Sequence, residues 1–135
     1  MRTLLIALLA GLGSLIPATA GACGACIEDK VAATYDHAVI DRAIASHRQV
    51  VFVAIEGPLS PEKVVAQIAA AAPKVRGVQS GSLRTSTSPP AFSFVLDTGQ
   101  DPRAAVATFR KSVTGQETQL VAIRLVRDGV LRELD

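Results

Sequence analysis

Two cysteines near the start of the chain, Cys23 and Cys26, are the residues whose type and spacing best permit chemistry. They form the segment Cys-Gly-Ala-Cys and are the only cysteines in the sequence. Two thiols separated by two residues can bind one soft metal ion, such as Cu(I) or zinc, or form a disulfide with each other. A disulfide across so short a loop removes little unfolded-state entropy, so we predict that the pair serves chemistry rather than stability.

A predicted helix over residues 27–46 begins directly after Cys26, and this position favours the thiolate. The free N–H groups and the positive dipole end of a helix stabilise negative charge, and Glu28 and Asp29 are typical of a first turn. A thiolate serves metal binding and disulfide exchange alike. The spacing leaves both open, together with an inert pair that only oxidises after export. Covalent haem attachment is excluded, because Ile27 stands where that motif has histidine.

The two histidines are the other candidate metal ligands. His37 lies eleven residues beyond Cys26, which is about 16 Å along a straight helix. One ion can therefore bind both only if the N-terminal arm folds back. His47 lies at the helix end, and an ordinary surface role is the alternative for each histidine. Two-coordinate Cu(I), or a site shared across a dimer, needs fewer ligands than a zinc site, so the predicted metal ligands are Cys23 and Cys26.

Motifs for other chemistries are absent from the sequence. It has no His-Glu-x-x-His zinc motif, no phosphate-binding loop and no Gly-x-Ser-x-Gly nucleophile elbow. Two further sets of polar residues have ordinary structural explanations. The first set is typical of turns and consists of Ser80, Ser82, Ser86 and Ser88. The second set is typical of a solvated sheet face and consists of Arg84, Arg124, Arg127 and Arg132. We therefore predict no catalytic residue, and an enzymatic role is not the favoured interpretation.

Residues 1–20 have the three parts of a cleavable secretory signal peptide. Arg2 gives a positive start, residues 4–16 are mostly apolar, and the small residues Ala18 and Ala20 occupy the −3 and −1 positions of a cleavage site. The apolar stretch is shorter than the roughly 20 residues that span a bilayer. The sequence thus predicts a periplasmic or secreted protein with no membrane span after cleavage. A membrane anchor and a lipoprotein acylated at Cys23 are the alternatives.

The charge and aromatic content argue against a nucleic-acid partner. The chain has 14 basic and 12 acidic residues, four phenylalanines, one tyrosine and no tryptophan. Nucleic-acid binding calls for a clustered basic face or stacking aromatic side chains, and this composition supplies neither.

The elements that must position the cysteines follow from hydrophobic periodicity, capping residues and turn signals. The sequence predicts helices over 27–46, 61–72 and 102–113, a polar loop over 85–90, and strands over 50–55, 78–85, 91–97, 118–126 and 130–134. Asp128-Gly129 predicts a hairpin between the last two strands. This order predicts a ferredoxin-like α+β sandwich, βαββαβ, with helices on one face, an additional N-terminal helix and a short C-terminal edge strand. The predicted organisation is a signal peptide (1–20), an arm with the cysteine pair and the N-terminal helix (21–49), and a ferredoxin-like domain (50–135).

The cysteine pair at a helix start, together with the βαββαβ order, resembles the heavy-metal-associated domains, which are small copper carriers. That resemblance implies that Cys23 and Cys26 bind Cu(I) and pass it between a metal-donor and a metal-acceptor protein. The pair precedes an additional helix here, whereas in that family it follows the first strand. The Cys-Gly-Ala-Cys string also resembles the active-site motif of thioredoxin-like oxidoreductases.

Three functions are therefore open from the sequence. The leading hypothesis is an exported protein that binds Cu(I) or another soft metal and acts as a carrier, sensor or sink. The alternatives are a thiol–disulfide oxidoreductase and a non-catalytic interaction module. The module would use a sheet edge or the two-faced N-terminal helix, and a homodimer through sheet edges is compatible with this hypothesis.

Overall fold

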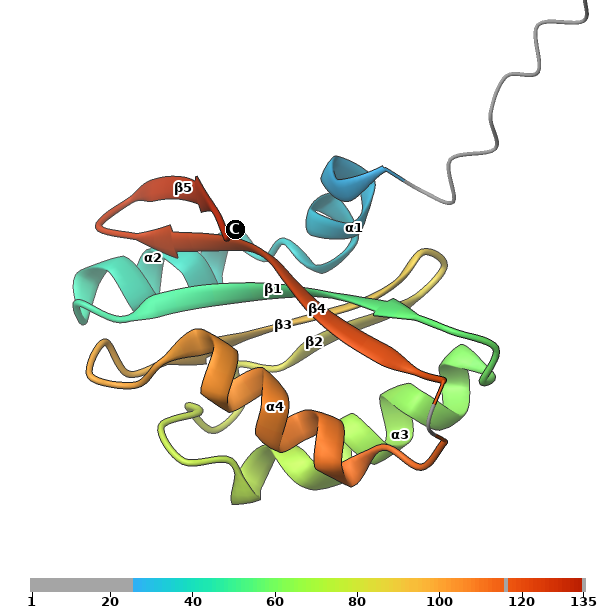
Figure 1. Cartoon of the computed structure of the whole chain (residues 1–135). Helices are drawn as coiled ribbons and strands as arrows, with labels where there is room; N and C mark the ends of the chain where they lie inside the picture. The colour runs from blue at the N-terminus through green and yellow to red at the C-terminus, as the bar shows by residue number, and fades with distance from the viewer. Residues whose placement is uncertain (1–25, 116, 135) are drawn as a thin grey trace, which may run out of the picture.

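A five-stranded antiparallel sheet with the strand order β2-β3-β1-β4-β5 forms the centre of the fold (Figure 1). The structure is a computed structural model that describes residues 26–115 and 117–134. The predicted signal peptide and Cys23 lie outside these residues. The elements are α1 (Ile27–Thr34), α2 (His37–Ala45), β1 (Gln49–Glu56), α3 (Pro61–Ala71), a 3-10 turn (Ala72–Lys74), β2 (Arg84–Thr87), β3 (Pro90–Leu96), α4 (Pro102–Ser112), β4 (Gln119–Arg127) and β5 (Val130–Glu133).

β1 is buried on both faces, as its continuous apolar run predicts. Side chains alternate along a strand, so β1 contributes to two separate cores. Val51 and Val53 belong to the core beneath α3 and α4, whereas Val50, Phe52 and Ala54 belong to the core beneath α1 and α2. We call these the closed face and the open face of the sheet.

The closed face is covered by α3 and α4, which lie side by side against it in Figure 1. Phe92 and Phe94 from β3 meet Phe109 from α4, with ring centroids 5.1–5.9 Å apart. Val64 and Ile68 of α3 are completely buried in the same core. The helices begin as predicted, each with proline in its first turn and Ser60 or Asp101 at the N-cap position.

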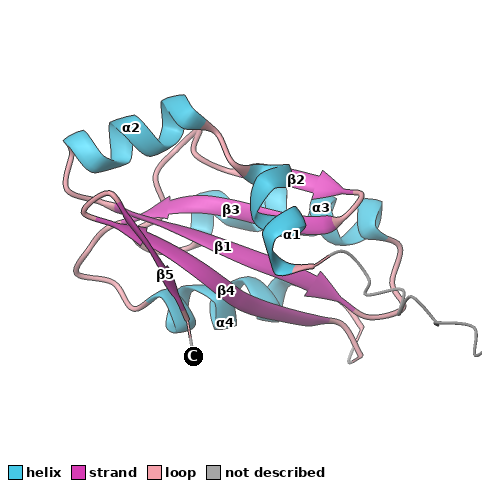
Figure 2. Cartoon of the chain, turned by 90° about the horizontal axis from the view of Figure 1, so that it is seen from above, coloured by secondary structure: helices cyan, strands magenta, loops and turns pink. Residues whose placement is uncertain are grey.

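The open face is covered by two short helices rather than by one long one (Figure 2). The predicted helix over 27–46 breaks at Tyr35 and Asp36, both of which have extended backbone. The Asp36 carboxylate accepts a hydrogen bond from the Val39 N–H and so starts a new helix in a different direction. Val31 of α1 and Ile40 of α2 thereby reach the open face from two elements.

The predicted ferredoxin-like βαββαβ sandwich with helices on one face is therefore wrong. The sheet has five strands, and four helices lie on its two faces, which gives three layers. The predicted strand over 78–85 is also wrong. Its first residues form turns, with Gly77 and Gly81 at positive φ, and a single bridge joins Val78 to Leu96. β2 starts only at Arg84, near the end of the predicted strand, and continues to Thr87, inside what the sequence predicts as a loop.

The hairpin predicted at Asp128-Gly129 is confirmed. Both residues have positive φ, 53° and 74°, as a tight turn between β4 and β5 requires. β5 lies at the sheet edge, and all four of its residues are exposed. None of the helices in the described residues combines the length and the apolar character that crossing a bilayer requires.

Candidate functional site

Cys26 occupies the N-cap position of α1 and is exposed to solvent. Its thiol donates a hydrogen bond to the Asp29 carboxylate, with 3.1 Å between Sγ and Oδ2. Its backbone carbonyl accepts the first hydrogen bonds of the helix from Asp29 and Lys30. The helix start after Cys26 is thus as predicted, whereas Cys23, its predicted partner, lies outside the described residues.

The prediction of a metal-binding, copper-loaded or disulfide-bonded centre is corrected for the part of the chain that the structure describes. Within residues 26–115 and 117–134 no group of three or more His, Cys, Asp or Glu side chains can hold a metal ion, and Cys26 forms no disulfide there. The physical reason is that the helix break sends His37 onto α2 and His47 beyond the end of α2, so neither completes a site at Cys26. The assignment of the pair Cys23 and Cys26 as ligands stays a prediction.

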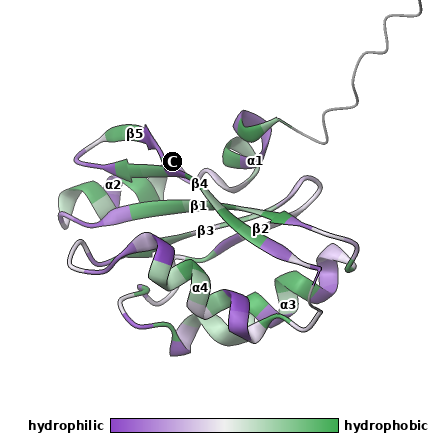
Figure 3. Cartoon of the chain, in the orientation of Figure 1, coloured by the Kyte–Doolittle hydropathy of each residue, from purple (hydrophilic) through white to green (hydrophobic). Residues whose placement is uncertain are grey.

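A concave surface lies instead on the open face, between α1 and the β4–β5 hairpin. We call it the α1–β5 groove. Its volume is about 440 Å³, and its lining is mainly apolar in area. It is lined by Glu28, Val31, Ala32, Tyr35, His37, Arg124 and Leu131. Figure 3 shows hydrophobic and hydrophilic residues next to one another on α1 and on β5.

The groove exists because the short α1 packs mainly on β3, β1 and β2 and leaves the β4–β5 side of the sheet less covered. Tyr35, at the end of α1, stacks on buried Phe52 with 6.2 Å between ring centroids. It also contacts the edge of the His37 ring at 4.8 Å. Since Phe52 belongs to the core, this stack fixes one wall of the groove to the body of the protein.

A bulge in β4 places the charged floor of the groove. Phe52 pairs with Arg124, while the next residue of β1, Val53, pairs with Ala122, so Ile123 is the extra residue. Ile123 is buried in the open-face core, and Arg124 is also directed to the open face. Arg124 of β4 lies directly opposite Glu133 of β5 in the antiparallel pair, which explains why their side chains are in contact.

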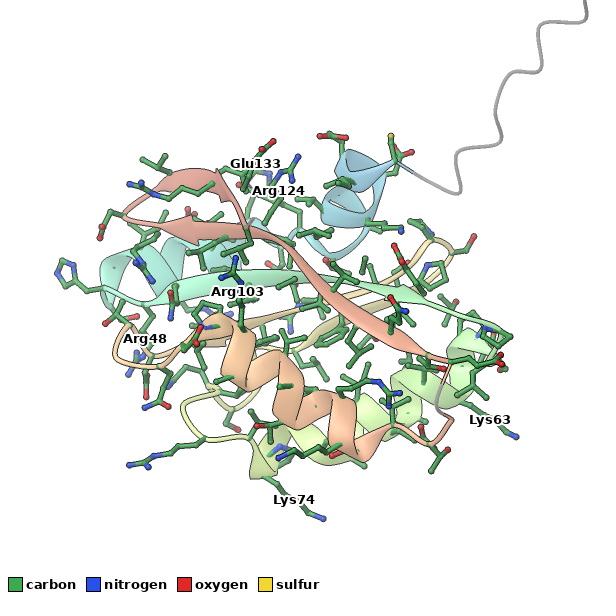
Figure 4. All side chains as sticks on the ribbon, in the orientation of Figure 1. Arg48, Lys63, Lys74, Arg103, Arg124 and Glu133 are labelled. Atoms are coloured by element: carbon green, nitrogen blue, oxygen red, sulfur yellow. The ribbon has the colours of Figure 1, made fainter. Side chains whose placement is uncertain are left out.

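Arg124 binds two carboxylates at the groove. Its guanidinium is 3.2 Å from Glu28 and 3.3 Å from Glu133, both from the same terminal nitrogen. Figure 4 shows Arg124 and Glu133 near each other. The arginine side chain is only 14% exposed, whereas the glutamates are 73% and 72% exposed. One largely buried positive charge thus binds two exposed negative charges, so the cluster has one more negative than positive group.

Sequence reasoning places Arg124 on a solvated face and misses its role as the floor of a groove. The sequence does contain a signal for the helix break that leaves the groove open. This signal is Asp36, because aspartate favours N-cap positions and so predicts a break inside 27–46. The bulge at Ile123 leaves no such signal, because its position depends on the pairing with β1.

A scan against protein-family models, a search of curated proteins and a search of solved structures each found no match to this chain.

Proposed function

We propose that this chain is an exported, non-catalytic interaction module whose α1–β5 groove binds an apolar peptide segment that carries a basic residue. The observation that carries this proposal is an apolar groove whose rim holds two exposed carboxylates, Glu28 and Glu133. The signal-peptide pattern of residues 1–20 supports export. Mass spectrometry of the protein isolated from the medium or periplasm tests export, with a mature chain beginning at Gly21 as the expected result.

Apolar contact supplies the affinity in this proposal. Tyr35 and Leu131 line the groove and are 41% and 53% exposed, although both are large apolar side chains. Covering such side chains gains about 25 cal/mol for each Å² of apolar surface removed from water. A groove of about 440 Å³ lies in the size range of ligand pockets, with room for the side chains of a short segment.

Charge supplies the specificity. The rim cluster of Glu28, Arg124 and Glu133 has one positive and two negative groups, so a lysine or arginine beside the apolar anchor finds a complementary partner. An acidic segment would instead face two carboxylates. Because the glutamates are exposed, their contribution is expected to weaken as salt increases.

The thiol–disulfide alternative receives less support from the geometry. Reactive thiolates are stabilised by nearby positive groups, whereas the Cys26 thiol is directed to the Asp29 carboxylate. An interaction module needs neither cysteine, so the double variant Cys23→Ser, Cys26→Ser should bind peptides as well as the unmodified protein.

Selection of random peptides by the purified protein, followed by affinity measurement, tests the proposal. We expect enriched sequences to combine aromatic or aliphatic residues with lysine or arginine. Leu131→Asp should weaken their binding at least tenfold. Val130→Asp is the matched control, because Val130 is 50% exposed and neighbours Leu131 on β5, but is directed to the other side of the strand.

Equal losses in the Leu131 and Val130 variants would contradict the proposal, since only Leu131 lines the groove. Enrichment of acidic peptides would contradict the role given to the rim. Self-association that Leu131→Asp abolishes would replace the peptide by a second copy of the chain and thus overturn the proposed partner.

A further inference from the structure

A second concave site lies on the open face at the other end of α2. It is formed by the last turns of α2, the connection to β1 and the loop over 79–82, and its volume is about 160 Å³. Two arginines line it, Arg42 from α2 and Arg48 from the connection. They come from separate elements and converge on one small pocket.

Both guanidinium groups are held in place through Nε alone. Arg42 Nε donates to the Ala38 carbonyl at 3.1 Å, and Arg48 Nε donates to the Asp97 carboxylate at 3.0 Å. Within the described residues, the terminal nitrogens of these two arginines have no hydrogen-bond partner, and Arg42 has no ion-pair partner. Each arginine therefore keeps a two-nitrogen fork free for a ligand, in an orientation that its Nε bond restricts.

The charge balance of the pocket is positive. Asp97 faces Arg48 and also accepts a hydrogen bond from Gln79 at 2.9 Å, so it offsets one of the two arginines. The described residues supply no carboxylate partner for Arg42. The carbonyls at the end of α2 are already satisfied, because Arg42 O accepts from Ser46 and Ala43 O accepts from the Arg48 N–H. They thus present little free negative charge to an incoming anion.

From these observations we propose that this pocket binds the phosphate group of a small phosphate monoester, held by Arg42 and Arg48. A phosphate group presents three or four oxygens, so each fork can bind its own oxygens, whereas both forks would have to share the two oxygens of a carboxylate. The exposed hydroxyl of Ser80 lines the same pocket and adds a neutral donor. The volume is about five times the roughly 30 Å³ that one water occupies in the liquid, which leaves room for part of the ester group.

Nuclear magnetic resonance titration of the purified protein with inorganic phosphate and with glycerol phosphate tests this site, with sodium chloride at equal ionic strength as the reference. We expect saturable shifts of the backbone amides in 42–48 and 79–82, with glycerol phosphate binding at least as tightly as inorganic phosphate. Arg42→Gln should weaken binding tenfold or more. Because Arg42 bonds only to its own helix, this variant should keep the fold.

Lys63→Gln is the matched control, because it removes one positive charge at the end of the molecule opposite Arg48 (Figure 4). Equal affinities of the Arg42 and Lys63 variants would overturn the site, and so would shifts no larger than those that chloride causes. Binding of inorganic phosphate with exclusion of glycerol phosphate would overturn the monoester assignment. Peptide binding at the α1–β5 groove is a separate readout, so the failure of either proposal leaves the other one standing.

Discussion

The closed and the open face of the sheet differ in how completely helices cover them. On the closed face, two eleven-residue helices bury three phenylalanines that are all 0% exposed. On the open face, helices of eight and nine residues cover the sheet only in part, and both the α1–β5 groove and the arginine pocket lie there. The closed face thus holds the aromatic core that stabilises the fold, whereas the open face carries the two surfaces that we propose for binding.

The largest expected effect lies on the closed face. Phe109→Ala removes a fully buried ring that contacts Phe92 and Phe94, and we expect the free energy of unfolding to fall by about 3–5 kcal/mol. Chemical denaturation with urea measures it. Tyr35→Ala, on the open face, is the comparison variant, and its loss should be clearly smaller because Tyr35 is 41% exposed. Similar decreases in the free energy of unfolding for both variants would show that the closed face does not contribute more stability than the open face.

An intermediate effect is expected where α1 is fastened to the open face. The buried Ser93 hydroxyl donates to the Thr34 carbonyl at 2.9 Å and so ties the end of α1 to β3. Ser93→Ala leaves that carbonyl without its partner, at a cost of about 1–3 kcal/mol. Hydrogen exchange should accelerate in α1 and not in α3.

Thr108→Ala is the control for Ser93, because its exposed hydroxyl also donates to a backbone carbonyl, that of Ala104 within α4. Loss of a solvent-exposed bond of this kind should change the free energy of unfolding little. If exchange rose equally in α1 and α3 of the Ser93 variant, the open face would not be an independently loosened layer.

Elements with strong local signals could be predicted from the sequence. The buried run of β1, the proline starts of α3 and α4, and the Asp128-Gly129 turn each depend on a few neighbouring residues, and each was predicted within one or two positions. The layer arrangement could not be predicted in the same way. It depends on whether the 27–46 segment is one helix or two, and a single side-chain cap at Asp36 decides that.

The candidate sites were even harder to predict from the sequence than the layer arrangement, because both are formed by residues that are distant in sequence. Glu28 and Glu133 meet at Arg124 only after the sheet has formed, and the β4 bulge sets the pairing that directs Arg124 to the open face. The cysteine pair, which is the clearest motif in the sequence, lies at the border of the described residues. Within those residues it contributes to neither the α1–β5 groove nor the arginine pocket. Local motifs therefore predicted a chemistry, whereas long-range pairing determined the geometry.

The smallest expected effect concerns pH and again separates the two faces. Arg84 of β2 donates to the Asp36 carboxylate at 2.7 Å, and this bond, followed by the bond from the Val39 N–H, holds the pKa of Asp36 below its ordinary value. A carboxyl whose pKa is lower in the folded state stabilises the fold above its unfolded pKa. That contribution is lost as the pH falls through the ordinary value and on through the lower folded one.

Asp36→Asn should keep an oxygen that caps α2 but lose the charge that attracts Arg84. The unmodified protein should therefore be slightly more stable than this variant at pH 7, and the difference should shrink as the pH falls below the ordinary pKa of 3.8. A double-mutant cycle with Arg84→Gln isolates the pair, because its coupling should be weaker at pH 3 than at pH 7. Hydrogen exchange at low pH should quicken first in α2, since Asp36 begins that helix, while the closed-face helices α3 and α4 stay protected. Coupling that is unchanged at pH 3 would show that the contact does not depend on the charge of Asp36, and the open face would then lose its proposed sensitivity to acid.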